Sequence, residues 1–124
     1  MKSFKSLRRA FTLVEIMIVV LIIGILLAIA IPNFIRARES SRAKACVSNL
    51  RQVDSAKEQW AMDYRQAAGS TGLGASFPNT MLVGASGYIK GTPLCPSSGT
   101  YTIGAVGTDP TCSVGGTGAL GHTL

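Results

Sequence analysis

The distribution of hydrophobic and polar residues divides the chain into three regions. Residues 11–31 are apolar apart from Thr12 and Glu15. At about 1.5 Å per residue, a helix of this length spans roughly 30 Å, the thickness of a bilayer core. We therefore expect a membrane-spanning helix over residues 11–32, preceded by a separate basic segment at residues 1–10.

The second region, residues 33–68, contains neither glycine nor proline and predicts an amphipathic helix. Pro32 separates it from the apolar helix and is expected to interrupt or bend a helical stretch of about 55 residues. Gly69 is expected to end it. Apolar or small residues recur at steps of three and four, and these should share one face: Val47, Leu50, Val53, Ala56, Trp60 and Tyr64. Asp54, Glu58 and Asp63 are expected on the solvated face of the helix. Further charged residues should also fall outside the apolar face: Arg51, Lys57 and Arg65.

The third region, residues 69–124, holds thirteen of the fourteen glycines and four of the five prolines. Short β-prone pieces occur at residues 80–83, 87–90 and 100–106, separated by turn-forming sequences. We expect two or three short antiparallel strands that pack on the apolar helix face, with Trp60 and Tyr64 as contacts. The predicted fold class is α+β, a long N-terminal helix packed against a small antiparallel sheet.

The net charge of +6 comes mainly from the start of the chain. Four of the twelve basic residues lie within the first ten positions, and the remaining eight face six acidic residues. The bulk of the chain is therefore nearly balanced, and we expect no binding to nucleic acid. The basic start favours a single-pass protein with its N-terminus in the cytoplasm.

Glu15 is the one ionised side chain inside the apolar run. A charge within a span costs about 2.5–3.5 kcal/mol on insertion scales, and such groups are usually paired. Residues 11–31 contain no lysine or arginine. Two interpretations of Glu15 are open. Its carboxylate either stays hydrated near the membrane–water interface, or it pairs with the α-amino group of a neighbouring copy whose chain begins at Phe11.

The sequence "RRA" followed by "FTLVEIMIVVLIIGILLAIAIPNF" resembles the class III signal of type IV prepilins and type II secretion pseudopilins. The shared features are a basic leader, a Phe that becomes residue one of the mature chain, a Glu four residues later, an apolar helix and a Pro near its end. The resemblance implies cleavage between Ala10 and Phe11, N-methylation of Phe11, and assembly roles for Glu15 and Pro32. The family usually has Gly before the cut, and Ala10 is the smallest replacement.

This resemblance implies a structural subunit of a type II secretion pseudopilus or a type IV pilus. The short tail favours the pseudopilus. The implied partners are identical or related pilin subunits, prepilin peptidase, an inner-membrane assembly platform, and membrane lipid before assembly. The filament would extend into the periplasm or outside the cell. The resemblance is strong to residue 34 and does not extend to the tail.

Two alternatives remain open from the sequence. Ala28 and Ala30 form the small-residue pattern that ordinary signal peptidase recognises, and this cut would release a soluble domain starting at Ile31. A monomeric, membrane-anchored binding module is the other alternative. We expect no enzyme and no cofactor, because the chain has a single histidine, no phosphate-binding loop and no recognisable carboxylate pair.

Three cysteines suggest further chemistry. Cys95 and Cys112 lie seventeen residues apart in the tail, and we expect a disulfide between them, which would contribute about 3 kcal/mol in the chain-entropy model. Cys46 in the helix is then left over, unless it replaces one of the tail cysteines in the pair. A zinc site formed with His122 is the alternative, although no C-x2-C pair is present and we expect no metal.

Overall fold

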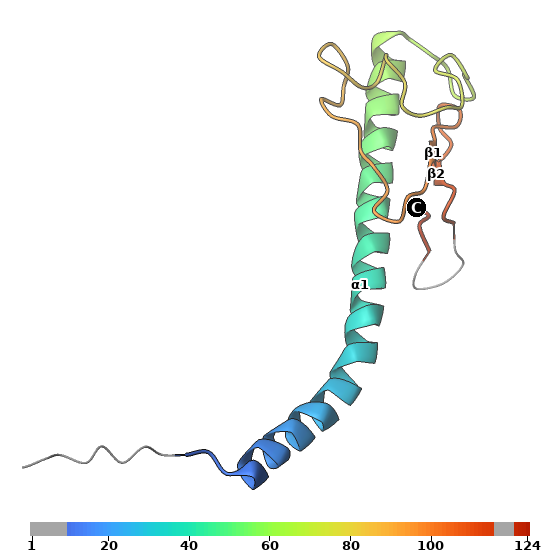
Figure 1. Cartoon of the computed structure of the whole chain (residues 1–124). Coiled ribbons are helices and arrows are strands. Elements are labelled where there is room, and N and C mark those ends of the chain that lie inside the picture. The colour runs from blue at the N-terminus through green and yellow to red at the C-terminus, as the bar shows by residue number, and fades with distance from the viewer. Residues whose placement is uncertain (1–9, 116–120) are drawn as a thin grey trace, which may run out of the picture. The chain divides into compact units, whose positions relative to one another are not determined.

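A computed structural model describes residues 10–115 and 121–124. The described elements are a helix α1 (Leu13–Asp63), a strand β1 (Tyr101–Thr102) and a strand β2 (Thr111–Cys112) (Figure 1). Contacts divide the chain into two compact units, residues 1–36 and 37–124, and each is described by itself. The basic leader predicted at residues 1–10 lies outside the described residues apart from Ala10.

The helical part of the first unit is the apolar half of α1. Thr12 caps it, because its Oγ1 accepts a hydrogen bond from the backbone N–H of Glu15 at 3.3 Å. None of the most apolar 18-residue window is buried within the protein. By length and composition this helix can cross a membrane, and we treat it as the membrane-spanning segment.

An interruption at Pro32 is not observed, because α1 is continuous from Leu13 to Asp63, and the alternative of a bend stays a prediction. A proline removes its own N–H donor and crowds the preceding turn, but the residues on either side keep their helical conformation. Isolated prolines are tolerated in membrane helices because neighbouring groups satisfy the freed carbonyls.

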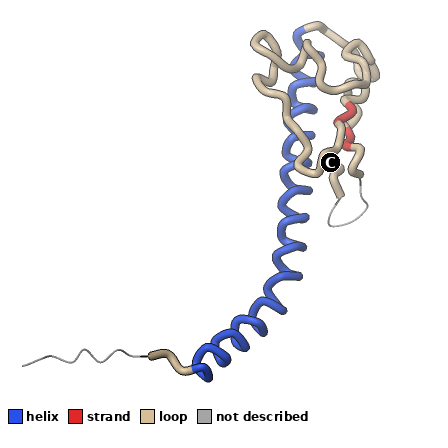
Figure 2. Tube along the Cα trace, viewed as in Figure 1, coloured by secondary structure: helices blue, strands red, loops and turns tan. Residues whose placement is uncertain are grey.

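The second unit is built on the remaining part of α1, and the predicted amphipathic face is confirmed there. Buried residues recur at the spacing of one helix face, and loops rather than extended strands cover them (Figure 2). Tyr64 differs from the expectation, since it is exposed and stacks on Trp60 with ring centroids 5.5 Å apart. The buried face consists of Ala43, Cys46, Leu50, Val53, Ala56, Lys57, Trp60 and Ala61.

The helix ends at Asp63, before Gly69, through a left-handed residue that the sequence did not suggest. Arg65 has a φ of 50°. Its N–H donates to the carbonyl of Met62, and the N–H of Gln66 donates to the carbonyl of Ala61. These two bonds form a Schellman-type end, so a non-glycine residue takes the position that glycine usually occupies.

The sheet has two antiparallel strands, within the predicted two or three, but each strand is only two residues long. Tyr101 lies opposite Cys112, and Thr102 lies opposite Thr111. The strand predicted at residues 100–106 is therefore present in its first part. The segments 80–83 and 87–90 contribute only an isolated parallel bridge, between Val83 and Ile89. The two buried clusters of the second unit are centred on Trp60 and on Leu50 respectively.

Lys57 corrects a prediction, because it lies among the buried residues of α1 and not on another face of the helix. Its ammonium donates to the backbone carbonyl of Thr108 and lies 3.0 Å from Oδ1 of Asp54. Next to it, Oε1 of Glu58 accepts from the N–H of Gly107 at 3.1 Å. The helix thus holds the loop at residues 107–108 through charged groups, which a pattern of apolar spacing does not reveal.

We predict that Lys57→Ala lowers the free energy of unfolding by on the order of 2 kcal/mol, because the Thr108 carbonyl and Asp54 lose their partner. Urea unfolding of the full chain in detergent, followed by the fluorescence of the single tryptophan Trp60, measures this. Lys90→Ala is the matched control, since Lys90 is exposed. Equal midpoints for the two variants would show that the buried ammonium does not stabilise the fold.

Candidate functional site

The first candidate site is the segment around the start of α1. Ala10 and Phe11 precede the helix in non-helical conformation, and both are exposed. Glu15 is the third residue of the helix, where its N–H bonds to Thr12. The sequence Thr-x-x-Glu before an apolar run is the pattern of a capping box, so this helix start was recognisable from sequence.

Glu15 has no ion-pair partner among residues 10–115 and 121–124. The two ion pairs found there join Arg42 to Glu39 and Lys57 to Asp54, both in the second unit. A carboxylate in the first turn interacts favourably with the positive end of the helix dipole, although the effect is small. The carboxylate of Glu15 therefore remains available to a group from outside the described residues.

The second candidate site brings together the residues that the sequence analysis named as an alternative zinc set. Four segments supply them: α1, the loop before β1, strand β2, and the described end of the chain. All four side chains are buried, and their ligand atoms lie within 4.8 Å of one another. We call this group the thiol–imidazole cluster; it consists of Cys46, Cys95, Cys112 and His122.

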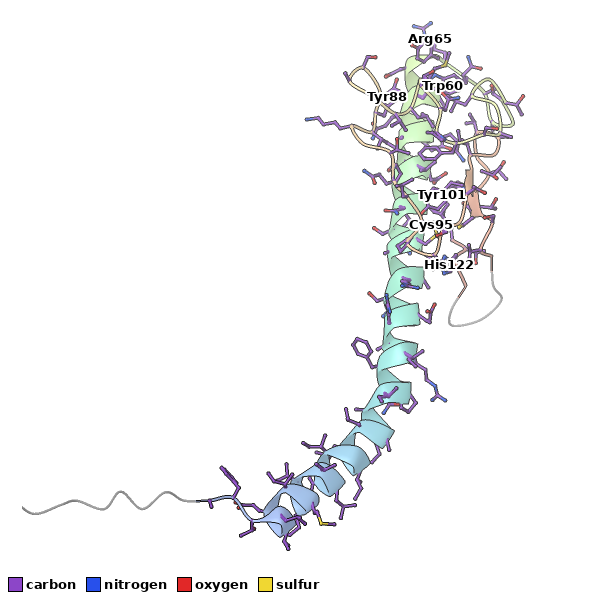
Figure 3. The ribbon with its side chains drawn as sticks, in the orientation of Figure 1. Trp60, Arg65, Tyr88, Cys95, Tyr101 and His122 are labelled. Atoms are coloured by element: carbon purple, nitrogen blue, oxygen red, sulfur yellow. The ribbon has the colours of Figure 1, made fainter. Side chains whose placement is uncertain are left out.

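Two distances define the centre of the thiol–imidazole cluster. Sγ of Cys95 lies 3.6 Å from Nδ1 of His122 and 3.7 Å from Sγ of Cys112. Figure 3 shows Tyr101, Cys95 and His122 close together beside α1. All three cysteines are free thiols in this structure. The Cys95–Cys112 disulfide stays a prediction, for which the two residues are suitably near each other.

Two of the three thiols, Cys46 and Cys95, have surroundings that shift their pKa values in opposite directions. Burial raises the pKa of Cys46 to about 12, although Tyr101 partly opposes this by hydrogen bonding. Burial also opposes ionisation of Cys95, but the backbone N–H groups of Ser97 and Gly99, together with His122, outweigh it. The pKa of the Cys95 thiol is therefore lowered to about 7. Its surroundings therefore favour the thiolate of Cys95, whereas those of Cys46 favour the thiol.

Tyr101 links the cluster to the helix through a chain of hydrogen bonds. Nδ2 of Asn49 donates to the Tyr101 hydroxyl at 3.1 Å and to the carbonyl of Leu94 at 2.9 Å. The Tyr101 hydroxyl lies near the thiol of Cys46 and lowers its pKa, against the larger effect of burial. Burial is the main reason that the pKa of Tyr101 is raised, so its hydroxyl stays protonated.

Gly99 lets the backbone approach two of the sulfur atoms. A Cβ placed on Gly99 would lie 2.6 Å from Sγ of Cys112 and 3.2 Å from Sγ of Cys95. The loop at residues 95–99 closes by a turn in which the N–H of Ser98 donates to the carbonyl of Cys95. This loop is therefore shaped around the sulfur atoms, and glycine is required for close contact.

Comparison with known proteins places the first site in a family. Residues 5–31 match the prokaryotic N-terminal methylation motif. The chain is 34% identical over 89 residues to a ComG operon protein 3 homolog of Bacillus licheniformis, with 72% of this chain and 82% of the relative covered. It is 30% identical over 103 residues to type II secretion system core protein G of Klebsiella michiganensis, with 77% and 72% covered.

A third relative matches more closely over a shorter stretch. Type IV major pilin protein PilA of Myxococcus xanthus is 47% identical over 57 residues, which are 46% of this chain and 26% of the relative. The chain thus spans about a quarter of that pilin. No solved structure gives a significant match.

These matches define a class of membrane-anchored proteins with a methylated N-terminus. The chain belongs to the family of type IV pilins and type II secretion pseudopilins.

We predict that Gly99→Ala lowers the free energy of unfolding by about 1–3 kcal/mol, because the new methyl group overlaps the sulfur of Cys112. Gly91→Ala is the matched control, since a Cβ at Gly91 meets nothing within 4 Å. Urea unfolding of both variants in detergent measures the difference. If Gly99→Ala were as stable as Gly91→Ala, the loop would not pack on the sulfur atoms as described.

Proposed function

We propose that this chain is a structural subunit that is processed by prepilin peptidase and polymerised into a filament through its N-terminal helix. The observation that carries the proposal is an exposed apolar helix with a lone carboxylate in its first turn, directly after Phe11. The methylation motif at residues 5–31 and the pilin relatives support it.

Processing between Ala10 and Phe11 agrees with the local conformation. A peptidase needs an accessible, non-helical peptide, and both residues lie before α1 in exposed chain. The cut would free the amine of Phe11 four residues before Glu15. The mature assembly helix would then occupy residues 11–32, followed by the helix of the globular part, within residues 33–68, and the glycine-rich region, residues 69–124.

The charge on Glu15 gives the subunits a specific contact. In lipid, an unpaired carboxylate costs about 2.5–3.5 kcal/mol, which is recovered when a cation approaches. The described residues offer Glu15 no such cation, whereas the N-terminal amine of an adjacent subunit would supply one at the same depth in the membrane. The pairing therefore favours assembly over the separate subunit.

Packing of the apolar helices would complete the filament. Lipid tails are as apolar as the side chains of residues 13–31, so assembly gains little from the hydrophobic effect and depends on close packing and on the Glu15 pairing. A contact between two different surfaces of identical subunits repeats without closing and generates a helical filament.

A type II secretion pseudopilus is our first choice for the filament. The match to type II secretion system core protein G extends over 77% of this chain, whereas the match to the Myxococcus pilin covers 46%. A type IV pilus for adhesion, motility or DNA uptake is the second candidate, favoured by the higher identity of that pilin match. In either case the chain is no enzyme.

The proposed location is the bacterial inner membrane, with the N-terminus in the cytoplasm and the globular part outside. The partners would be related subunits, prepilin peptidase, the assembly platform, and lipid before assembly. Ordered multimers on crosslinking through residues 11–31 would distinguish a filament subunit from a monomeric anchored module.

We predict that Glu15→Ala inserts and is processed normally but yields at least tenfold fewer filaments, because the pairing with a neighbouring amine is lost. Filaments sheared from cells and quantified by immunoblot, relative to membrane-bound subunit, measure this. Glu39→Ala is the control, since Glu39 forms an exposed pair with Arg42 at 3.6 Å, and such pairs contribute little. Wild-type filament yield from Glu15→Ala would refute the pairing.

We predict that Ala10→Gly is cleaved severalfold faster by prepilin peptidase than the native chain, because the family usually has glycine before the cut. Ala10→Val should be cleaved more slowly, since its branched side chain is bulkier. The cleaved fraction over time, read from the shift in size on a gel, measures both. Equal rates for the two variants would mean that the cut lies at another peptide bond.

A further inference from the structure

We propose that the thiol–imidazole cluster binds one zinc ion and that this ion is a structural part of the globular unit. The inference does not depend on the filament function. It rests on where the fold brings the four side chains, since they are far apart in the sequence and their ligand atoms lie within 4.8 Å of one another. The sequence spacing alone favoured a disulfide, whereas the geometry favours zinc.

Two distances within the cluster are close to those of a tetrahedral zinc site. With Zn–S of about 2.3 Å and Zn–N of about 2.0–2.1 Å, two sulfur ligands of a tetrahedron lie about 3.8 Å apart and a sulfur and a nitrogen about 3.5 Å apart. The observed distances from Sγ of Cys95 are 3.7 Å to Sγ of Cys112 and 3.6 Å to Nδ1 of His122. Closing the longer pairs on the ion requires shifts of only about 1 Å.

The type and burial of the ligands identify the metal and its role. Three thiols and one imidazole form a standard donor set for structural zinc, and thiolate-rich tetrahedral sites select zinc over calcium or magnesium. Cys46 is fully buried, and the other three side chains are at most 8% exposed. Four protein ligands leave no coordination position for water, which is characteristic of structural sites.

Groups around the ligands are arranged to support bound thiolates. The Tyr101 hydroxyl, which accepts a hydrogen bond from Asn49, lies near Cys46 and favours its thiolate. The backbone N–H groups of Ser97 and Gly99 favour the thiolate of Cys95. Outer groups of this kind orient metal ligands and stabilise their charge.

Zinc would join segments of the globular unit that have little regular structure to hold them together. The sheet has two strands of two residues each, and most of the remaining chain is loop. One ion would join helix α1, the loop before β1, strand β2 and the segment of His122. Binding releases the three thiol protons to solvent as three Zn–S bonds and one Zn–N bond form, and no group is oxidised.

The first experiment distinguishes zinc from a disulfide in the full chain purified in detergent from membranes, without added metal. We expect the native mass to include one zinc ion and the denatured mass to be that of the fully reduced chain. A denatured mass lower by two hydrogen atoms, with Cys95 and Cys112 joined in the peptide map, would overturn the proposal. So would failure of the reduced, folded chain to bind added zinc.

The second experiment tests the ligands through cobalt(II), which takes the place of zinc and absorbs light when thiolates coordinate it in a tetrahedron. We expect Cys46→Ala to lose most of the thiolate-to-cobalt absorption. Val53→Ala is the matched control, because Val53 is equally buried on the same helix face and is outside the cluster. Full cobalt absorption in Cys46→Ala, or equal loss in Val53→Ala, would contradict the assignment.

A third variant removes only an outer hydrogen bond. Tyr101→Phe keeps the ring, which packs edge-on against Phe77 with ring centroids 5.9 Å apart. It loses the hydroxyl beside Cys46. We expect its zinc affinity, measured by competition with a chelator, to fall about tenfold. An unchanged affinity would show that the hydroxyl does not support a bound thiolate, and would argue against Cys46 as a ligand.

Discussion

The constraint on which the molecule depends is that one helix must satisfy two environments. Apart from Glu15, residues 13–31 present apolar side chains on every side, and none of the most apolar window is covered by the described chain. Burying such a surface is worth about 25 cal/mol per Å², so it requires lipid or other helices. Further along α1, only one face is apolar, and the protein's own loops cover it. Two surroundings would cover the apolar surface of this segment: membrane lipid before assembly, and neighbouring helices in the core of a filament.

The globular unit faces the opposite difficulty, because it has little regular structure with which to close its core. Its loops are held instead by individual polar contacts to the helix, such as the ammonium of Lys57 on the carbonyl of Thr108 and the amide of Asn49 on Leu94. The thiol–imidazole cluster, which lies beside Tyr101, is a further point at which the loops meet the helix. A metal or a crosslink at this point is what a small core with short strands generally needs.

The sequence predicted well whatever depends on periodicity or on a contiguous motif. The apolar helix and the buried position of Trp60 followed from spacing, and the family followed from the residues around Phe11. Spacing failed for Lys57, whose burial depends on a carbonyl about fifty residues away. It also could not show that His122 lies beside Cys95, because contacts distant in sequence are set by how the loops fold back. The end of the helix was not predicted from the sequence, because Arg65, a non-glycine residue, adopts the left-handed conformation that follows it.

The most direct test of the filament account is the identity of the first residue of the mature protein. Intact mass combined with N-terminal sequencing of the chain recovered from membranes determines it. The account predicts that the chain begins at Phe11 with a methylated amine, which would place the cation required by Glu15 at the start of every subunit. A chain that begins at Ile31 would contradict it, since the protein would then be a secreted domain that retains neither Glu15 nor most of the apolar helix.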